Sequence, residues 1–335
     1  MPRPGPRNLI TDVPGLTVGS AQDEAVRTGV TVILCPEGWS AAVDVRGGGP
    51  GVRETETLSP ENSFSRAHAI CLSGGSVFGL GAADGVASVL SVHDVGIRRV
   101  PTSPAIPIVP AAVLHDLGNG GDKGWGLDPP YRGLGMAAAA AAGEDFQLGA
   151  VGAGRGAMAG LIKGGLGSAS VDLGGGLIVG ALVAANPVGS VVMPDGETFW
   201  AWPFEIDSEF GGRFPKGPVS ATEPLPDESK LGVAGRLRAG ANTTLAVIAV
   251  TADLSTAEAK RVAMMAHDGM GRAVRPAHTT FDGDVVFALA SGAVTLGSDP
   301  ALRPVEVSRL GSAAADCLAR AIARAVHEAR EFRER

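Results

Sequence analysis

The chain has 335 residues, enough for one large domain or two ordinary ones with a sizeable hydrophobic core. Hydrophobic residues make up 45% of it and charged residues only 19%, which excludes a disordered chain. The net charge of −7, with no basic run, gives no indication of binding to nucleic acid or to an anionic membrane.

The first half of the chain reads as short strands joined by glycine-rich turns. Residues 30–35 predict a strand closed by Pro36, and residues 41–46 predict a second strand. The glycine-rich residues 47–51 follow, and they lack the Lys-Ser/Thr pair of a phosphate-binding loop, so a tight turn is favoured over an anion site. Residues 69–80 run from a strand through a Ser-Gly-Gly turn into a small-residue helix, which indicates close packing beside a pocket.

The second half predicts longer elements. Buried strands are expected at residues 169–173, 177–185, 245–250 and 285–290, and helices at 135–143, 256–275 and 312–331. Ser255 and Glu258 have the spacing of a capping box at the start of the second of these helices. Residues 200–238 are rich in proline and charge, which predicts a long, mobile surface excursion. Helices that flank buried strands predict a layered α/β or α+β fold in one domain.

A threonine stands at the entrance of the strand expected over residues 245–250. If the bond between Asn242 and Thr243 were cut, Thr243 would carry a free α-amine beside its own hydroxyl, the N-terminal-threonine form of a nucleophile. A plain turn before a strand accounts for the same two residues. Asn242 also fits the glycosylation pattern, but the first seven residues have no apolar segment, so we expect no signal peptide and no glycosylation.

A few other polar residues are candidates for chemistry. Asp282 and Asp284 flank a glycine before a strand, where they are suited to orient an ammonium or a hydroxyl group; an exposed Asp-Gly turn is the alternative. Asn186 ends an apolar strand, where its amide is suited to stabilise an oxyanion, although Asn-Pro is also an ordinary turn. Lys163 is a cation in an apolar, glycine-rich region.

The cysteines and histidines indicate no metal site. Cys35, Cys71 and Cys317 lie in apolar stretches without metal-ligand spacing, which predicts buried, reduced thiols in a cytoplasmic protein. The histidines are scattered, and the spacing of His267 and His278 gives no metal pair, so each is expected to be a surface or core residue. We expect no metal and no cofactor.

Nine short motifs occur in an order typical of one known family. They are residues 10–19 (ITDVPGLTVG), 43–48 (VDVRGG), 50–55 (PGVRET), 72–76 (LSGGS), 151–154 (VGAG), 163–170 (KGGLGSAS), 242–244 (NTT), 265–269 (MAHDG) and 281–284 (FDGD). On these motifs the chain resembles, over nearly its whole length, the DmpA-like self-processing aminopeptidases (peptidase family S58). β-Aminopeptidases and nylon-oligomer hydrolases belong to the same family.

The resemblance implies a fold, an activity and a set of site residues. The expected fold is a four-layer αββα sandwich similar to N-terminal-nucleophile hydrolases, made as one inactive chain that cuts itself before Thr243. Fragments 1–242 and 243–335 would stay associated and assemble into a homo-oligomer, a tetramer or octamer of such pairs. Asn186 matches the oxyanion residue of the family, and Asp282 and Asp284 match its acidic or hydroxyl pair.

Two positions depart from the family pattern. The lysine of some relatives aligns with Leu161, so Lys163 is the candidate for its role. Relatives often carry Phe or Tyr before the aspartate at Asp116, whereas this chain has His115, which we expect on the substrate side with Ser73 and Gly74.

Three functions remain open from the sequence. The resemblance favours removal of N-terminal residues from small peptides, amino-acid amides or esters, or hydrolysis of β-amino-acid and 6-aminohexanoate (nylon) oligomers. Acyl transfer of the ornithine-acetyltransferase type uses a similar self-cut threonine. An uncut binding or scaffold protein would require neither the cut nor the activity.

Overall fold

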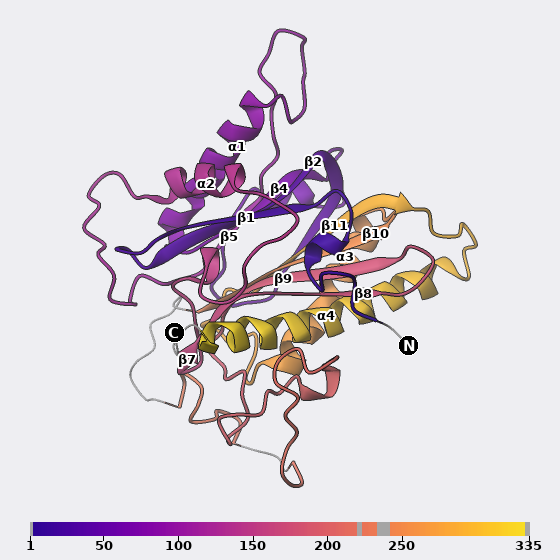
Figure 1. The fold of residues 1–335 in the computed structure, drawn as a ribbon. Coiled ribbons are helices and arrows are strands. Elements are labelled where there is room, and N and C mark those ends of the chain that lie inside the picture. The colour runs from indigo at the N-terminus through magenta and orange to yellow at the C-terminus, as the bar shows by residue number, and fades with distance from the viewer. Residues whose placement is uncertain (1–2, 220–222, 233–241, 332–335) are drawn as a thin grey trace.

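The computed structural model describes residues 3–219, 223–232 and 242–331. Its strands form one mixed sheet that folds over on itself, with helices on both outer faces (Figure 1). In spatial order the strands are β3 (Gly51–Arg53), β5 (Ala111–Val113), β4 (Arg66–Ser73), β2 (Thr28–Val45), β11 (Val285–Val294), β10 (Thr243–Ala252), β9 (Ile178–Asn186) and β8 (Gly165–Asp172), with β1 (Thr17–Asp23) paired to β2. A small hairpin, β6 (Met158–Ala159) and β7 (Ile162–Lys163), lies apart from this sheet.

Four helices cover the two outer faces. Helices α1 and α2 pack on the half of the sheet that contains β1, β4 and β5, and α3 and α4 pack on the half that contains β8 to β11. The helices are α1 (Ala82–Val92), α2 (Tyr131–Ala140), α3 (Thr256–Ala273) and α4 (Arg303–Glu331). The four-layer αββα arrangement expected for the chain is therefore confirmed. None of the helices in the described ranges has the length and apolar character needed to cross a bilayer.

Three hydrophobic cores separate the four layers. On β10, the side chains of Leu245, Val247 and Ala249 lie in the central core between the two halves of the sheet. The alternate side chains of Ala246 and Ile248 lie in the core beneath α3 and α4. Because successive side chains of a strand point to opposite faces, a strand buried on both faces is continuously apolar, as residues 245–250 are.

Strand β2 belongs to both halves of the sheet. Its first part pairs with β4 and its last part pairs with β11, with an irregularity between Leu34 and Trp39 where the strand bends. The prediction of two strands divided at Pro36 is wrong, because Pro36 and Glu37 lie exposed at this irregularity and the pairing resumes after it. A bulge tolerates a proline that the interior of a regular ladder would not.

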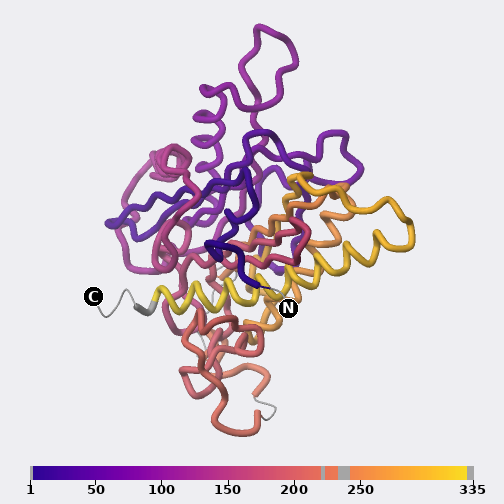
Figure 2. The backbone as a smooth tube through the Cα atoms, turned by 45° about the vertical axis from the view of Figure 1, so that its right-hand side comes forward, coloured from indigo at the N-terminus to yellow at the C-terminus, as the bar shows by residue number. Residues whose placement is uncertain are grey.

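The segment expected to be a mobile excursion is packed in its described part. Phe199 and Phe210 are buried with their rings 5.4 Å apart, and Glu209 pairs with Arg320 on α4. The prediction is therefore wrong around the buried Phe210, whereas residues 211–219 are mostly exposed, as expected for a surface segment. Residues 220–222 and 233–238 lie outside the described ranges. Figure 2 shows residues 195–219 and 223–230 in a separate lobe beyond α4. The lobe is attached to the sandwich by buried aromatic and ionic contacts.

Arg320 joins three distant parts of the chain. Its guanidinium donates to the carboxylate of Glu209 at 2.5 and 3.0 Å, to the carbonyl of Ser170 at 2.8 Å and to Oδ1 of Asn8 at 2.9 Å. Both charged side chains are buried. Removing one member of such a pair leaves an unpaired charge in the interior.

We therefore expect Arg320→Met to lower the free energy of unfolding by about 3–5 kcal/mol, measured by urea denaturation. The matched control is Arg261→Met on the exposed side of α3, which should change it by less than about 0.5 kcal/mol. Equal losses in the two variants would contradict the structural role of Arg320.

Candidate active site

Thr243 is the first residue of β10 and is buried between β9 and β11. Its hydroxyl donates a hydrogen bond to the carbonyl oxygen of Asn242. The backbone N–H of Gly283 donates to the same oxygen at 2.9 Å. A nucleophilic hydroxyl and a backbone donor thus converge on one carbonyl group, which is the pairing that acyl chemistry requires.

The turn that carries Gly283 is held by the glycine-rich residues 47–49. Gly49 N–H donates to Asp282 O at 2.8 Å, and Gly47 N–H donates to Asp284 O at 3.3 Å. Gly48 N–H donates to the carbonyl of Thr279. A side chain at Gly47 would lie only 2.2 Å from the backbone nitrogen of Asp284. The N–H groups of this loop are used to pack the turn, in agreement with the prediction of a turn and not of an anion site.

The carboxylate of Asp282 is buried and receives three hydrogen bonds. Val188 N–H donates to it at 3.0 Å, and the backbone and hydroxyl of Thr279 donate at 3.0 and 2.7 Å. Burial, and then the nearby negative charge of Asp284, raise the pKa of Asp282 above its usual value. The alternative of an exposed Asp-Gly turn is therefore wrong.

The carboxylate of Asp284 links the start of β10 to a histidine. It accepts from Thr244 N–H at 2.8 Å and contacts Nδ1 of His278 at 2.8 Å. The His278 ring lies 4.9 Å from the ring of His267, whose pKa is lowered to about 4 by burial. From the sequence, each of these histidines is expected to be a separate surface or core residue, whereas the fold brings their rings together. The position of His278, six residues before Asp284, was the one available signal.

Asn186 lies opposite Thr243 in the antiparallel pairing of β9 with β10. Its Oδ1 accepts from Met158 N–H at 2.9 Å, which turns its Nδ2 toward the carbonyl of His115 at 3.3 Å. Because Nδ2 carries two hydrogens, one remains for a further acceptor. The structure thus places Asn186 opposite Thr243 and the backbone of His115 beside Asn186, and the oxyanion role of Asn186 stays a prediction.

Ser73 ends β4 and Gly74 follows it, and no direct contact described above joins either residue to Asn186 or Thr243. The link between them and His115 is Asp116, which accepts from Gly75 N–H at 2.8 Å and from the Thr28 hydroxyl at 2.6 Å. Burial raises the pKa of Asp116 above its usual value. The assignment of Ser73, Gly74 and His115 to substrate binding stays a prediction.

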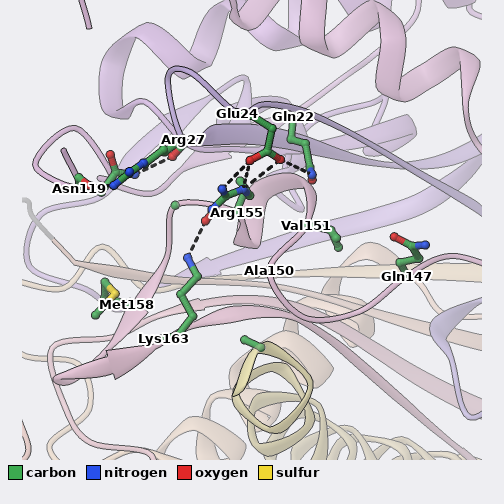
Figure 3. A pocket seen from close by; sticks show the side chains of 12 residues that line it. Gln22, Glu24, Arg27, Asn119, Gln147, Ala150, Val151, Arg155, Met158 and Lys163 are labelled. Atoms are coloured by element: carbon green, nitrogen blue, oxygen red, sulfur yellow. Dashed lines mark hydrogen bonds and ion pairs between the residues drawn. The ribbon is translucent and has the colours of Figure 1, made fainter. Parts of the chain in front are cut away.

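Lys163 lies beside a cavity of about 610 Å³ (Figure 3). Its ammonium donates to the carbonyl of Arg155 at 2.5 Å, and Arg155 pairs with Glu24 across the cavity. Met158 lines the same cavity and holds Asn186 through its N–H group. Lys163 lies on β7 of the small hairpin and lines this cavity, and its catalytic role also stays a prediction.

Lys230 is a site residue that the sequence did not indicate. Its ammonium donates to Oδ1 of Asn242 at 2.5 Å and to the carbonyl of Met158 at 2.8 Å. Burial lowers its pKa to about 7, although the charge of Asp282 acts in the opposite direction. It was missed because it lies within the proline-rich stretch that was expected to be exposed.

The three cysteines are free and buried, as predicted. Within the ranges that the structure describes, no three His, Cys, Asp or Glu side chains come together as metal ligands.

The model of peptidase family S58 matches residues 8–335. The chain belongs to peptidase family S58. It is 45% identical over 330 residues to an uncharacterized aminopeptidase of Mycobacterium tuberculosis, covering 94% of this chain and 92% of that protein. It is 32% identical over 334 residues to the 6-aminohexanoate-oligomer endohydrolase of Paenarthrobacter ureafaciens, covering 94% and 84%. The predicted family and its class, a hydrolase, are thereby confirmed.

A solved structure supports the fold. The L-aminopeptidase D-Ala-esterase/amidase of Ochrobactrum anthropi, described as a variant of the N-terminal-nucleophile hydrolase fold, matches with a TM-score of 0.65. It is 20% identical, and the match covers 98% of this chain and 88% of that one. The likeness supports an N-terminal-nucleophile hydrolase fold for this chain.

The geometry of the turn predicts a strict requirement for glycine at position 283. A Cβ atom there would lie 2.6 Å from the Thr243 hydroxyl and 2.8 Å from the carbonyl of Gly49. We expect Gly283→Ala to reduce the hydrolytic kcat/KM of this S58 protein by about 100-fold or more, since it displaces a nucleophile and a hydrogen-bond donor together. Gly297→Ala is the matched control, because a Cβ atom there meets open space. Full activity of Gly283→Ala would contradict this geometry.

Proposed function

We propose that this chain cuts its own bond between Asn242 and Thr243, and that the freed Thr243 then hydrolyses the amide or ester bond that follows the N-terminal residue of small peptides, amino-acid amides or amino-acid esters. One observation carries the proposal. The Thr243 hydroxyl and the Gly283 N–H group both meet the carbonyl oxygen of Asn242. The scissile carbonyl is therefore already held between a nucleophile and a group suited to bind an oxyanion.

The self-cleavage step follows from this geometry. Thr243 Oγ1 attacks the Asn242 carbonyl carbon, and the negative charge that develops on the oxygen is stabilised by the N–H group of Gly283. Collapse breaks the C–N bond, moves the acyl group to Oγ1 and protonates the α-amine of Thr243. Water then hydrolyses the ester, releasing the carboxylate of Asn242 and restoring the hydroxyl.

Turnover of substrates uses the amine that the cut creates. An α-amine has an ordinary pKa of about 7.7–8.0, so near neutral pH it is a far better base than a lysine amine at about 10.4. It removes the proton of the Thr243 hydroxyl during attack on the substrate and returns a proton to the leaving amine. Asn186 and Gly283 stabilise the oxyanion, and Asp282 and Asp284 orient the nucleophile and attract the substrate's ammonium.

The fold explains how two fragments would remain one molecule. Fragment 243–335 would contribute β10 and β11 to the middle of the sheet, where β10 pairs with β9 from Thr243 to Val250 and β11 pairs with β2. These strands lie between two hydrophobic cores. Separation would expose both cores, so we propose that fragments 1–242 and 243–335 stay associated in a single S58-type unit.

The relative from Paenarthrobacter supplies the second candidate substrate class. That protein is a 6-aminohexanoate-oligomer endohydrolase, and this chain is 32% identical to it over 94% of its own length. The same nucleophile would serve either substrate, because both reactions attack an amide carbonyl. Loops around the site decide between them.

The decisive experiment compares Thr243→Ala with Thr243→Ser. Thr243→Ala should remain a single 33.7 kDa species without amidase activity, whereas Thr243→Ser keeps a hydroxyl and should yield two fragments and retain activity. Intact mass and the release of p-nitroaniline from amino-acid anilides are the measurements. A Thr243→Ala protein that still splits and hydrolyses amides would overturn the proposal.

The same preparations separate the rival functions. A substrate panel should show release of free N-terminal residues, and a faster reaction with 6-aminohexanoate oligomers would select the second substrate class. Turnover of acetyl-ornithine would indicate acyl transfer. A wild-type chain that stays uncut and inactive would indicate a binding or scaffold protein.

A further inference from the structure

Lys230 contacts the residue on the upstream side of the proposed cut. Its ammonium donates to Oδ1 of Asn242 at 2.5 Å and to the carbonyl of Met158 at 2.8 Å. The N–H group of Met158 in turn holds Oδ1 of Asn186 at 2.9 Å. A single cation thus links the residue before the cut to the backbone that positions the candidate oxyanion residue.

The hydrogen bonds of Lys230 go to neutral groups. In the part of the chain that the structure describes, no carboxylate forms an ion pair with it within 4.0 Å, and its two partners are an amide and a peptide carbonyl. Removing an ammonium from water is unfavourable unless strong partners replace the water.

Asn242 has to be held in place for self-cleavage to proceed. Its backbone is fixed on one side by a parallel bridge to Asp282 and by the hydrogen bond from Gly283 N–H. Its side chain is fixed by Lys230, which leaves the carbonyl group little freedom to rotate away from the Thr243 hydroxyl. Holding the two reacting atoms in one geometry removes much of the entropic barrier to attack.

We propose that Lys230 is a positioning residue for self-cleavage, which acts by holding the side chain of Asn242 so that its carbonyl carbon faces the Thr243 hydroxyl. The inference rests on the proposed self-cleavage before Thr243. It assigns Lys230 to the cutting of the precursor, a step in which Asn242 occupies the place that the acyl residue of a substrate takes later.

The charge of Lys230 makes its effect on self-cleavage depend on pH, which distinguishes a positioning role from a purely structural one. The ionisable groups that act on it are Asp282, which favours its charged form, and His115, whose positive form would disfavour it. An ammonium is a stronger hydrogen-bond donor than a neutral amine. Because the pKa of Lys230 is lowered to about 7, its advantage to the cut should be largest below pH 7 and should decline as pH rises.

The test follows the splitting of the full chain after cell-free synthesis is stopped, with the cut fraction measured on gels and by intact mass. We expect Lys230→Met to slow the cut by about tenfold or more, since it removes a charge-assisted hydrogen bond from the reacting residue. Lys216→Met, at an exposed position, is the matched control and should split at the wild-type rate.

Two further measurements separate positioning from folding. Asn242→Ala removes the acceptor and leaves the lysine in place, so it should also slow the cut, and the double variant should be no slower than Asn242→Ala alone. The wild-type cutting rate divided by the Lys230→Met cutting rate should decrease as the pH is raised from about 6 to about 9. If Lys230→Met does not fold, as judged by circular dichroism, Asn242→Ala decides the question.

The outcomes distinguish this inference from the proposed function. Wild-type splitting rates in Lys230→Met or in Asn242→Ala, a double variant that is slower than both, or a pH-independent ratio would each overturn the role of Lys230. In those cases an uncut Thr243→Ala would leave the proposed function standing. A wild-type chain that never splits would overturn both.

Discussion

The structure depends on one hydrogen bond, from the N–H group of Gly283 to the carbonyl of Asn242. It ties the start of β10 to the turn before β11, and it is possible only because residue 283 has no side chain to meet the Thr243 hydroxyl. The turn is fixed from behind by the glycines of residues 47–49, whose N–H groups bond to it and to Thr279. Three segments far apart in sequence therefore determine the position of one carbonyl group.

The burial of two neighbouring carboxylates makes an unfavourable electrostatic contribution to the stability of this site. Asp282 and Asp284 repel each other, and burial penalises both charges, which is why the pKa of Asp282 is raised. Backbone N–H groups of Val188, Thr279 and Thr244 offset part of this by donating to the carboxylates. Such groupings of like charge are concentrated at functional sites, where reactivity and not stability accounts for them.

Features that depend on local sequence pattern were predicted correctly. The continuous apolar run after Thr243, the helix-capping pair Ser255 and Glu258, and the layered fold are all present in the structure. The sequence placed Asp282 and Asp284 beside a glycine before a strand, and the structure puts that turn against the start of β10, where Asp284 accepts from Thr244 N–H. Strand β2 was misjudged because Pro36 normally ends a strand, and only the pairing with β4 and β11 reveals that the ladder resumes.

The contacts of Lys230 and His278 were not predictable for a different reason. Each lies in a segment whose composition resembles exposed loops, and burial there is decided by tertiary packing against Asn242 and Asp284. Composition reports the average environment of a segment and not the position of one side chain within it.

If the chain is cut before Thr243, the pairing of β10 with its neighbours would hold the new N-terminus where it was, because the register with β9 begins at Thr243 itself and the register with β11 begins at Leu245. The residue released is Asn242, whose surroundings are Lys230, Gly283 and Asp282. These groups then face whatever acyl residue a substrate presents to Thr243. The precursor therefore already contains the acyl side of the substrate site, occupied by its own chain, and the first reaction empties it without moving the nucleophile.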